Sequence, residues 1–439
     1  MPAPRELILA AMFPGDGNFV AWRHPDAGSQ TDFASFAHFA RTAERGLFDM
    51  LLMGESLGVV ERDGQVLDHT VIGRPDLWTL MPGLAAVTER VGLAATRSAR
   101  FNEPWELARQ FATLDHLSGG RAVWNVVTSL GQKAENFRSG YSVSYADRYA
   151  QASEFIAVSR RLWTTAATEG TGRARLDHDG EFFSVHADFA VPVGPQVVPP
   201  IIQAGGSTEG RDFGAAVADV IFTDHQGIGS AQAFHADVRR RAAAVGRDPA
   251  TIRVITGVSF VVADSDAEAR EKAAWYEDLL TSPRVAIDLL EQLWGRDLST
   301  YDPDGPLPEI EPDWEAAYRY TSRRAVGERD ARTEVARYRA LAEEHGLTIR
   351  QVIAKVGTRF AFTGSPGAIA DEMTRWFTGR AADGFVITPK LLPYGLDEFV
   401  DHIVPELQER GVFRTAYTGS TLRDHLGLAS VSLPAAAGR

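Results

Sequence analysis

Residues 104–129, PWELARQFATLDHLSGGRAVWNVVTS, predict a helix, a tight turn and a buried strand in direct succession. Pro104 stands where a first-turn proline is tolerated, and apolar residues recur after it at helical spacing. The pair Gly119–Gly120 suits the end of this helix, because glycine accepts the left-handed backbone found there. The apolar run Ala122–Val127 then predicts a strand.

The same alternation of strand and helix repeats some eight times along the chain. Strands are expected at Leu7–Met12, Asp49–Met53, Val91–Thr96, Ala122–Val127, Pro200–Ala204, Val220–Phe222, Val254–Val262 and Gly384–Thr388. Such alternation predicts a parallel sheet with helical crossovers, and the number of units favours closure over an open doubly wound sheet. The expected fold class is therefore α/β, a (β/α)₈ TIM barrel with loop insertions.

The chain is expected to form one barrel domain over residues 1–430, followed by a tail at 431–439. The alternation of strand and helix is interrupted from about residue 281 to residue 324, where aromatic side chains are mixed with prolines and acids. This stretch is too long for a barrel connection, so we expect an ordered insertion that acts as a lid. A small hairpin arm over the barrel is expected near Phe182–Val185.

Composition excludes several classes of protein. The 439 residues include no cysteine and carry a formal net charge of −13. The lack of cysteine excludes disulfides, thiolate nucleophiles and iron–sulfur clusters, and it fits a reducing cytosol. No basic run suggests a nucleic-acid partner, and no stretch approaches the roughly 18 apolar residues of a membrane span. The first apolar run is better read as a strand than as a signal peptide, so a cytoplasmic location is expected.

Polar or small residues follow four of the predicted strands, at the barrel face where enzymes of this fold carry their chemistry. The set comprises Glu55, Thr96, Ser98, Asn125, Thr128, Ser129, Gln203, Gly205, Gly206 and Ser207. Small polar residues are common in the loops after strands, which explains any single member of this set. Their convergence from four strands favours an active site on one rim of the barrel. His24, His69 and His225 stand in loops that can face a substrate, although each also fits an ordinary surface histidine.

The stretch Ile202–Thr208, IQAGGST, is the strongest local signal for a ligand. Two glycines let the backbone approach closely, and the free N–H groups of the following helix attract a phosphate. Ser207 suits either the helix cap or the phosphate, and Arg211 adds a charge that Glu209 opposes. Ordinary capping explains this turn equally well. No metal site is expected, because no His-Glu-x-x-His motif is present.

The segment Leu114–Leu130 closely resembles the bacterial-luciferase-like flavin monooxygenases, in the branch of nitrilotriacetate monooxygenase, pristinamycin synthase and dibenzothiophene sulfone monooxygenase. Further matches begin at Ala21 (AWRHP), Glu135 (ENF), Asp147 (DRY), Gln203 (QAGGS), Asp304 (DGPLP) and Ala382 (ADGF). They run in the family's order from about residue 7 to residue 427. The resemblance is specific for the family and uninformative about the substrate.

The resemblance implies reduced FMN (FMNH2) from a separate NAD(P)H-dependent flavin reductase, with O2 as co-substrate for the oxygenation of a small organic substrate. It also implies a homodimer or homotetramer. The cofactor contacts expected by position are Glu55, Thr96, Asn125, Thr128, Tyr145, Tyr149, Gly205, Gly206 and Ser207. Asn125 and Tyr145 are expected as catalytic donors near the reacting oxygen. Trp22, His24 and His225 are expected to face the substrate.

Two positions depart from the family's pattern. Relatives usually have Asp where Glu55 stands, and often have His where Tyr145 stands. A phenol donates a hydrogen bond but is no base near neutral pH unless its pKa is strongly perturbed. Three alternatives stay open: a deazaflavin-dependent oxidoreductase, a non-catalytic flavin-binding protein, and a flavin-independent barrel hydrolase that uses Glu55 and a strand-end acid such as Asp224.

Overall fold

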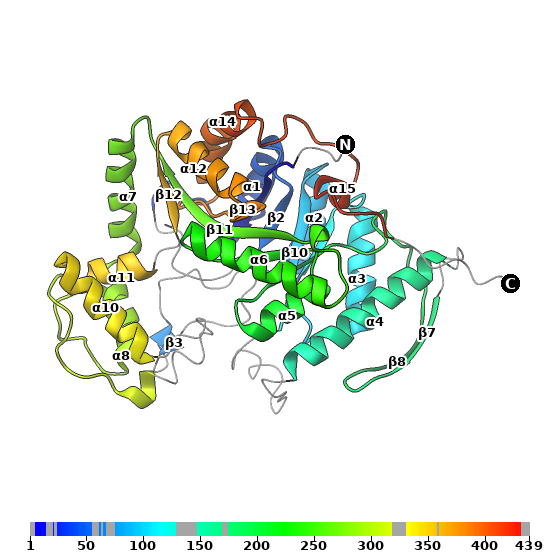
Figure 1. Ribbon diagram of the computed structural model, residues 1–439, viewed down its shortest axis with the longest axis horizontal. Helices are drawn as coiled ribbons and strands as arrows, with labels where there is room; N and C mark the ends of the chain where they lie inside the picture. Colours follow the sequence, from blue (N-terminus) through cyan, green and yellow to red (C-terminus); the bar gives the residue numbers. More distant parts are fainter. Residues whose placement is uncertain are drawn as a thin grey trace.

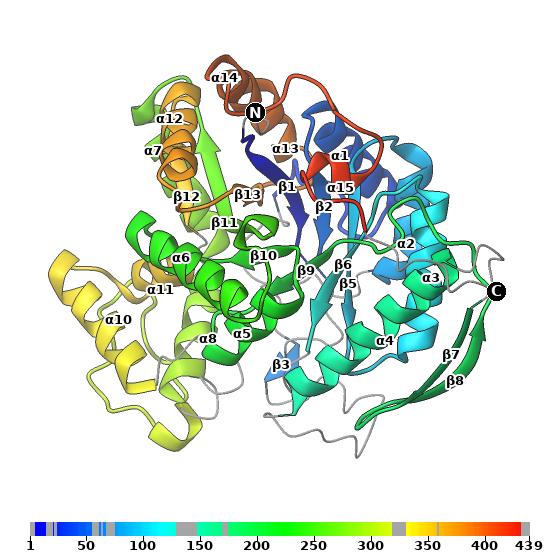
Figure 2. The same cartoon turned by 45° about the vertical axis from the view of Figure 1, so that its right-hand side comes forward.

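Eight parallel strands close into a barrel in this computed structural model (Figures 1 and 2). The structure describes residues 5–14, 21, 24–54, 61–62, 65–66, 75–128, 147–168, 174–317, 331–357 and 360–431. Around the barrel the strands are β1 (Ile8–Phe13), β2 (Met50–Met53), β5 (Gly92–Ser98), β6 (Ala122–Val127), β9 (Ile201–Ala204), β10 (Val220–Thr223), β11 (Arg253–Val262) and β13 (Gly384–Ile387). The predicted α/β TIM-barrel class and its eight strands are confirmed.

The strand register shows how the barrel closes. β13 pairs in parallel with β1, and β10 pairs in parallel with β11. The first part of β11 lies between β10 and β13, whereas its end pairs with a ninth strand, β12 (Ala361–Gly364). β12 was not expected from the sequence. It lies outside the barrel, where the long segment between β11 and β12 returns to the sheet.

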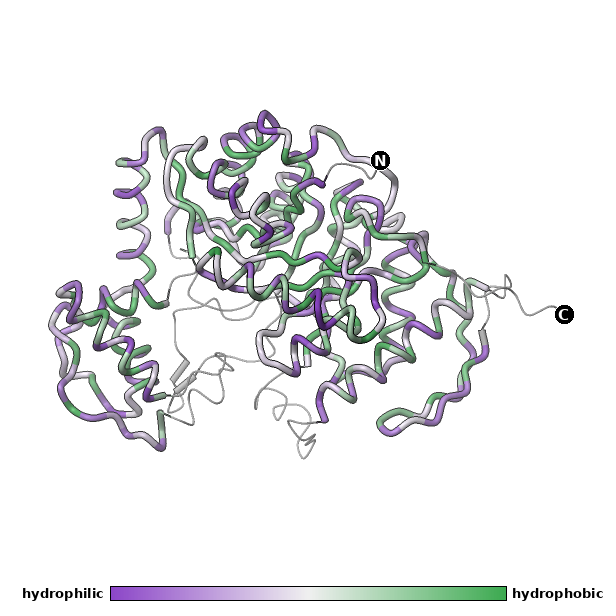
Figure 3. The backbone as a smooth tube through the Cα atoms, in the orientation of Figure 1, coloured by the Kyte–Doolittle hydropathy of each residue, from purple (hydrophilic) through white to green (hydrophobic). Residues whose placement is uncertain are grey.

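The barrel interior is a packed core. Inward-facing residues come from alternate positions of the strands, namely Ile8, Ala10, Met50, Leu52, Ala94, Val123, Ile202, Val220, Ile255 and Val386. Helix α15 (Leu422–His425) adds Leu422 from below, and the Leu422 N–H donates to the Gly120 carbonyl just before β6. The amino-terminal end is therefore closed, and hydrophobic residues dominate the strands in Figure 3. Chemistry is left to the carboxyl end.

Buried carboxylates fix the strand starts at the closed end. Asp49, before β2, accepts the Leu9 N–H of β1 at 2.8 Å and pairs with Arg414 at 2.5 Å. Asp383, before β13, accepts the Val254 N–H of β11 at 2.9 Å. Each carboxylate thus ties two neighbouring strands together. Both carboxylates need these partners, because a charge buried without one is costly.

Helices surround the barrel and cover the outer face of its strands. They are α1 (Phe33–Arg45), α2 (Leu77–Val87), α3 (Pro104–Leu117), α4 (Arg148–Thr168), α5 (Thr208–Val217), α6 (Ile228–Ala244), α12 (Pro366–Thr378), α13 (Gly395–Glu398) and α14 (Val404–Glu409). Trp124 of β6 packs between Phe111 of α3 and Phe155 of α4, at ring-centroid distances of 5.6 and 5.5 Å. Gly119 and Gly120 end α3 with φ of +69° and +91°, as the sequence predicts.

The segment between β11 and β12 forms a helical unit on the side of the barrel opposite α15 (Figures 1 and 2). It contains α7 (Asp266–Leu280), α8 (Pro283–Trp294), α10 (Ala331–His345) and α11 (Ile349–Gly357). Its separate core includes Leu290, Trp294, Val335 and Ile353. The expected insertion at 281–324 is described as far as residue 317, and the same core continues to α11. The single-domain boundaries and the lid role stay predictions.

A hairpin of β7 (Ala174–Asp179) and β8 (Ser184–Phe189) packs against α4 and α3. The Glu154 carboxylate of α4 accepts the backbone N–H groups of residues 181–183 at 3.0–3.1 Å. The hairpin expected near Phe182–Val185 is therefore confirmed, but it lies against the outer helices α3 and α4 and not over the barrel. Glu154 holds the turn against an outer helix.

Candidate functional site

Thr96 and Asn125 face each other at the carboxyl ends of β5 and β6. They are direct partners in the parallel register, and Asn125 Nδ2 donates to Thr96 Oγ1 at 2.9 Å. The Thr96 hydroxyl in turn donates to the Met53 carbonyl of β2 at 2.7 Å. Three neighbouring strands are thus linked at this rim. Alternate residues of a strand point into the barrel, so Thr96 and Asn125 lie on the same inward face as Ala94 and Val123 of the packed core. Both side chains therefore stand above that core.

The other end of the Asn125 amide is not satisfied. Asn125 Oδ1 is buried and accepts no hydrogen bond from the described residues. A buried acceptor left without a donor costs roughly 1–3 kcal/mol, so such an atom in a binding face indicates a ligand that donates a hydrogen bond. Thr128, another predicted contact, stands just past β6 and is partly buried.

The turn between β9 and α5 forms an open backbone cradle, which we define as residues 205–207. Ser207 caps α5, and its Oγ accepts the Gly210 N–H at 3.1 Å. A Cβ at Gly205 would lie 2.4 Å from Gln203 Nε2, whereas a Cβ at Gly206 would meet no atom within 4 Å. Packing therefore disfavours a side chain at the first position, where Gln203 would have to move, and leaves space at the second. An open backbone at a helix N-terminus suits an anion.

Tyr149 brings a phenol to the cradle from the first turn of α4. A Cβ at Gly210 would lie 2.9 Å from Tyr149 Oη and 3.2 Å from Ser207 Oγ. The Tyr149 ring packs on Phe213 of α5, with centroids 5.2 Å apart. Two hydroxyl groups thus approach the same small glycine surface, and both can donate hydrogen bonds to an anion.

Arg148 is a site residue that the sequence reasoning missed. Its side chain is 4% exposed, its guanidinium lies 4.5 Å from the centre of the Tyr149 ring, and its Nη2 donates to Tyr149 Oη at 3.1 Å. The only sequence signal was its place beside Tyr149 in the DRY match. A buried cation next to the cradle strengthens the case for an anionic ligand.

His225 lies on the same side as the cradle, just past β10. Its ring packs on Phe234 of α6 with centroids 4.9 Å apart, and the Arg211 guanidinium lies 5.4 Å from the same Phe234 ring. Burial, and then the charge of Arg211, lower the pKa of His225 below its ordinary value. His225 is therefore neutral at neutral pH and able to exchange a proton or a hydrogen bond.

His24 belongs to a different neighbourhood. Its ring meets Trp275 of α7 edge-on, with centroids 5.0 Å apart, and its Nδ1 accepts the Asp26 N–H at 3.1 Å. The structure thus brings Thr96 together with Asn125, and Tyr149 together with the cradle, but it places His24 beside the helical unit. Other residues singled out in the sequence lie outside the described residues, namely Trp22, Glu55, His69, Ser129 and Tyr145.

Lys390, a second residue that the sequence reasoning missed, follows β13. Its side chain is 6% exposed, and its carbonyl accepts the Ala21 N–H at 2.7 Å. This contact joins the segments that follow β1 and β13. A lysine buried at a barrel rim has no obvious sequence signal, because burial depends on the loops that fold around it.

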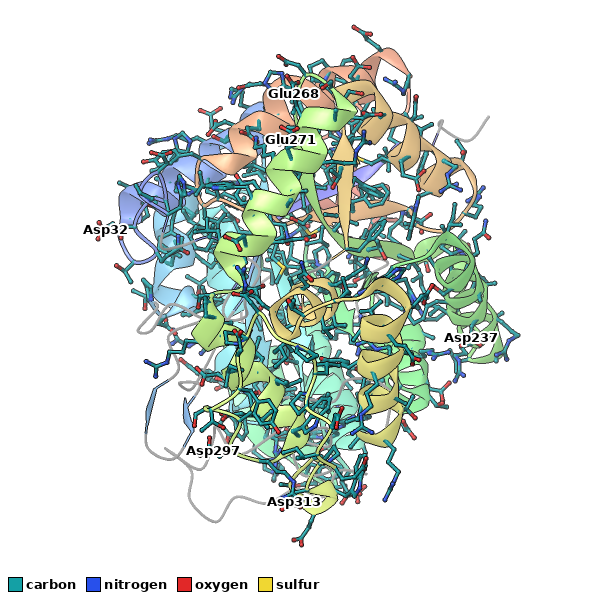
Figure 4. The ribbon with its side chains drawn as sticks, turned by 90° about the vertical axis from the view of Figure 1, so that its left-hand side faces the viewer. Asp32, Asp237, Glu268, Glu271, Asp297 and Asp313 are labelled. Atoms are coloured by element: carbon teal, nitrogen blue, oxygen red, sulfur yellow. The ribbon has the colours of Figure 1, made fainter. Side chains whose placement is uncertain are left out.

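Six acids labelled in Figure 4 stand around the outside of the molecule: Asp32 just before α1, Asp237 on α6, and Glu268, Glu271, Asp297 and Asp313 in the helical unit. Over the part of the chain that the structure describes, no three His, Asp or Glu side chains form a metal-binding group. His186 contacts Asp177 and Asp179 at 3.1 and 2.9 Å within the exposed hairpin. None of the helices within those same ranges has the length and hydrophobicity of a membrane span.

The structure shows a TIM-barrel protein with an open glycine turn before α5 and an unsatisfied amide at its carboxyl rim. The family model described as "Luciferase-like monooxygenase" matches residues 17–383. The chain therefore belongs to the luciferase-like monooxygenase family, as the sequence resemblance implies.

The chain is similar along its length to several known proteins. It is 40% identical to N-acetyl-S-(2-succino)cysteine monooxygenase of Bacillus subtilis (strain 168), over 97% of both chains. It is 38% identical to nitrilotriacetate monooxygenase component A of Aminobacter aminovorans, over 98% of both. A solved structure of riboflavin lyase with modified FMN and riboflavin superposes with a TM-score of 0.77, at 28% identity, over 97% of this chain and 96% of that one.

Proposed function

We propose that this protein is the oxygenase component of a two-component monooxygenase, in which a separate NAD(P)H-dependent reductase supplies FMNH2. The observation that carries the proposal is the position of the cradle beside the unsatisfied Asn125 amide. Asn125 lies opposite Ile202 in the register of β6 and β9, and β9 leads directly into Gly205. A ligand with a phosphate at one end and hydrogen-bond donors at the other fits these two features together.

The donors on this rim fit FMN in their chemistry. The N–H groups of the cradle, Ser207 Oγ and Tyr149 Oη suit the phosphate, with Arg148 behind them. Asn125 Oδ1 suits a donor on the ribityl chain or the ring edge, where Thr96 and Thr128 also stand. Glu55 and Tyr145 complete the proposed cofactor set by their resemblance to relatives.

Bound reduced FMN supplies the two electrons that allow one atom of O2 to enter the substrate and the other to leave as water. The protein's part is to position the reactants and exclude water. Met12 of β1 and Phe222 of β10 pack on the barrel core as partly buried apolar side chains. An apolar floor of this kind strengthens the hydrogen bonds made above it. Asn125 and Tyr145 are the proposed donors near the reacting oxygen.

The helical unit between β11 and β12 is the proposed lid, including the predicted insertion at about 281–324. The separate core shared by α8, α10 and α11 supports movement of these helices together, whereas α7 packs on β11 through Tyr276, Leu280 and Val261. The proposed substrate is a small organic molecule that faces Trp22, His24 and His225. A cytoplasmic homodimer or homotetramer without a nucleic-acid or membrane partner remains part of the same proposal.

A flavin-dependent turnover assay tests the proposal. The complete protein is incubated with NADH, FMN, an unrelated flavin reductase and a panel of small organic compounds, under air and under argon. Mass spectrometry with ¹⁸O2 should show one labelled oxygen in a product that requires both protein and reductase. Equal loss of substrate under argon contradicts the oxygenase and favours the hydrolase. FMN binding without any labelled product favours a non-catalytic flavin-binding protein.

A further inference from the structure

The carbonyl of Gly206, in the middle of the cradle, is held by a side chain from α5. Arg211 Nε donates to Gly206 O at 2.8 Å. Because Gly206 has no side chain and a Cβ there would meet nothing within 4 Å, its own packing cannot fix the peptide that follows it. The arginine is the described contact that orients this peptide.

Asp237 of α6 holds that arginine in place. Arg211 Nη1 pairs with Asp237 Oδ2 at 3.2 Å, and Arg241 Nε donates to the same oxygen at 2.9 Å. Arg240 reaches Asp237 from the solvent side. Burial acts to raise the pKa of Asp237, but hydrogen bonds from Arg241, Arg211 and Arg240 outweigh it and lower the pKa. Asp237 is thus a charged anchor at the outer edge of α6 (Figure 4).

We propose that Asp237 and Arg211 are positioning residues that preset the cradle for the phosphate of FMN. In a planar trans peptide the C=O and the N–H point in opposite directions. By holding the Gly206 carbonyl toward its own guanidinium, Arg211 turns the Ser207 N–H the other way and keeps a carbonyl dipole from facing the anion. This inference rests on the proposed function and adds that α6, outside the rim, sets phosphate affinity.

The geometry argues against a direct phosphate ligand at this position. The Arg211 guanidinium is already engaged by the Gly206 carbonyl and by Asp237, and it also lies over Phe234. A side chain with these three contacts acts on the ligand through the backbone. A purely structural role in joining α5 to α6 would affect any ligand of the barrel, whereas a cradle role affects only ligands that carry a phosphate.

Comparison of FMN with riboflavin separates the two roles. Dissociation constants of the complete protein are measured for both flavins by fluorescence quenching, in the wild type and in Arg211→Met, Asp237→Asn and Arg375→Gln. Arg211→Met should weaken FMN binding about tenfold and leave riboflavin binding within about twofold. Asp237→Asn should give a smaller loss of the same FMN-only kind. Arg375→Gln on α12, whose side chain is 60% exposed and pairs with Glu372, should match the wild type with both flavins.

Equal losses for FMN and riboflavin, or no loss for FMN, in both Arg211→Met and Asp237→Asn overturn the inference. If Arg211→Met does not fold, the Asp237→Asn result decides alone, because that change keeps the shape of the side chain. A wild-type protein that binds neither flavin overturns the proposed function instead, so the two failures are distinguishable.

Discussion

Asn125 of β6 lies directly opposite Ile202 of β9 in the parallel register of the barrel. Since β9 ends at Ala204, this pairing sets the unsatisfied Asn125 Oδ1 beside the start of the cradle. Two features that are far apart in the sequence thus become neighbours through strand order alone. The parallel pairing places these two segments at the same end of the barrel. A site made from both would be impossible if they lay at opposite ends.

The two cradle glycines should respond differently to alanine. Gly205→Ala places a Cβ 2.4 Å from Gln203 Nε2 and 3.1 Å from Gly210 Cα, so we expect a loss of about 1–3 kcal/mol in the free energy of unfolding. Gly206→Ala meets nothing and should leave that free energy unchanged while it weakens FMN binding. Urea denaturation and FMN titration measure both. Equal destabilisation by the two changes would contradict the described packing.

Loss of the Asn125 amide should impair chemistry more than folding. Asn125→Ala removes the hydrogen bond to Thr96 Oγ1 and an acceptor that no described residue satisfies, so the free energy of unfolding should fall by no more than about 1 kcal/mol. If the amide assists near the reacting oxygen, product formation should fall by about 10²-fold, as when one preorganised donor is lost elsewhere. Ser153→Ala, on the exposed face of α4, is the control. Unchanged turnover in Asn125→Ala would remove this residue from the catalytic set.

The pKa of His225 should report the charge of Arg211. Burial and Arg211 hold this pKa below its ordinary value, so NMR titration of the wild type should find a neutral ring at pH 7. Arg211→Met should raise the pKa toward the ordinary value, because one of the two causes is removed. A His225 pKa that does not move would show that Arg211 exerts no electrostatic effect on the ring.

His425 should make stability depend on pH. Its side chain is buried, its ring nitrogens have no hydrogen-bond partner among the described residues, and burial with Arg414 lowers its pKa to about 4. In the unfolded chain the pKa of His425 has its ordinary value of about 6.5. Between pH 4 and pH 6.5 the unfolded chain therefore binds more protons than the folded protein. The free energy of unfolding should therefore decline by up to about 3 kcal/mol as the pH falls from 6.5 toward 4.

Replacement of His425 tests that window. His425→Leu should flatten the decline in unfolding free energy between pH 6.5 and 4, as measured by urea denaturation at several pH values. His116→Gln, on the exposed surface of α3, should leave the decline intact. The same slope in His425→Leu and in the wild type would mean that other groups cause it.

The barrel was predictable because each of its strands is a local apolar run. Ala122–Val127 was predicted with the bounds that β6 has, and the rim position of Thr96 and Asn125 follows from the parallel order. The role of α15 could not be seen, because Leu422 acquires its importance only by filling the space beside Gly92. The same limit applies to charged groups.

The burial of Arg148 and Lys390 depends on segments that are distant in the sequence. The contact of Arg211 with Asp237 needs the packing of α5 on α6, which no local pattern specifies. The packing of the hairpin on α3 and α4 could not be seen for a similar reason, since Glu154 of α4 accepts the N–H groups of its turn. β12, with the sequence AFTG, contains one large apolar residue, Phe362, and so lacks the apolar run that marked β2 and β13, which are equally short.

The closure of the barrel floor by Leu422 and its neighbours has a consequence for synthesis of the protein. A nascent chain that has emerged from the ribosome only as far as β13 already contains every barrel strand, but its interior stays open to water at one end. Early termination would leave that apolar surface exposed to chaperones and proteases. Leu422, Leu426 and Leu428 therefore complete the barrel only after all of its strands have been made.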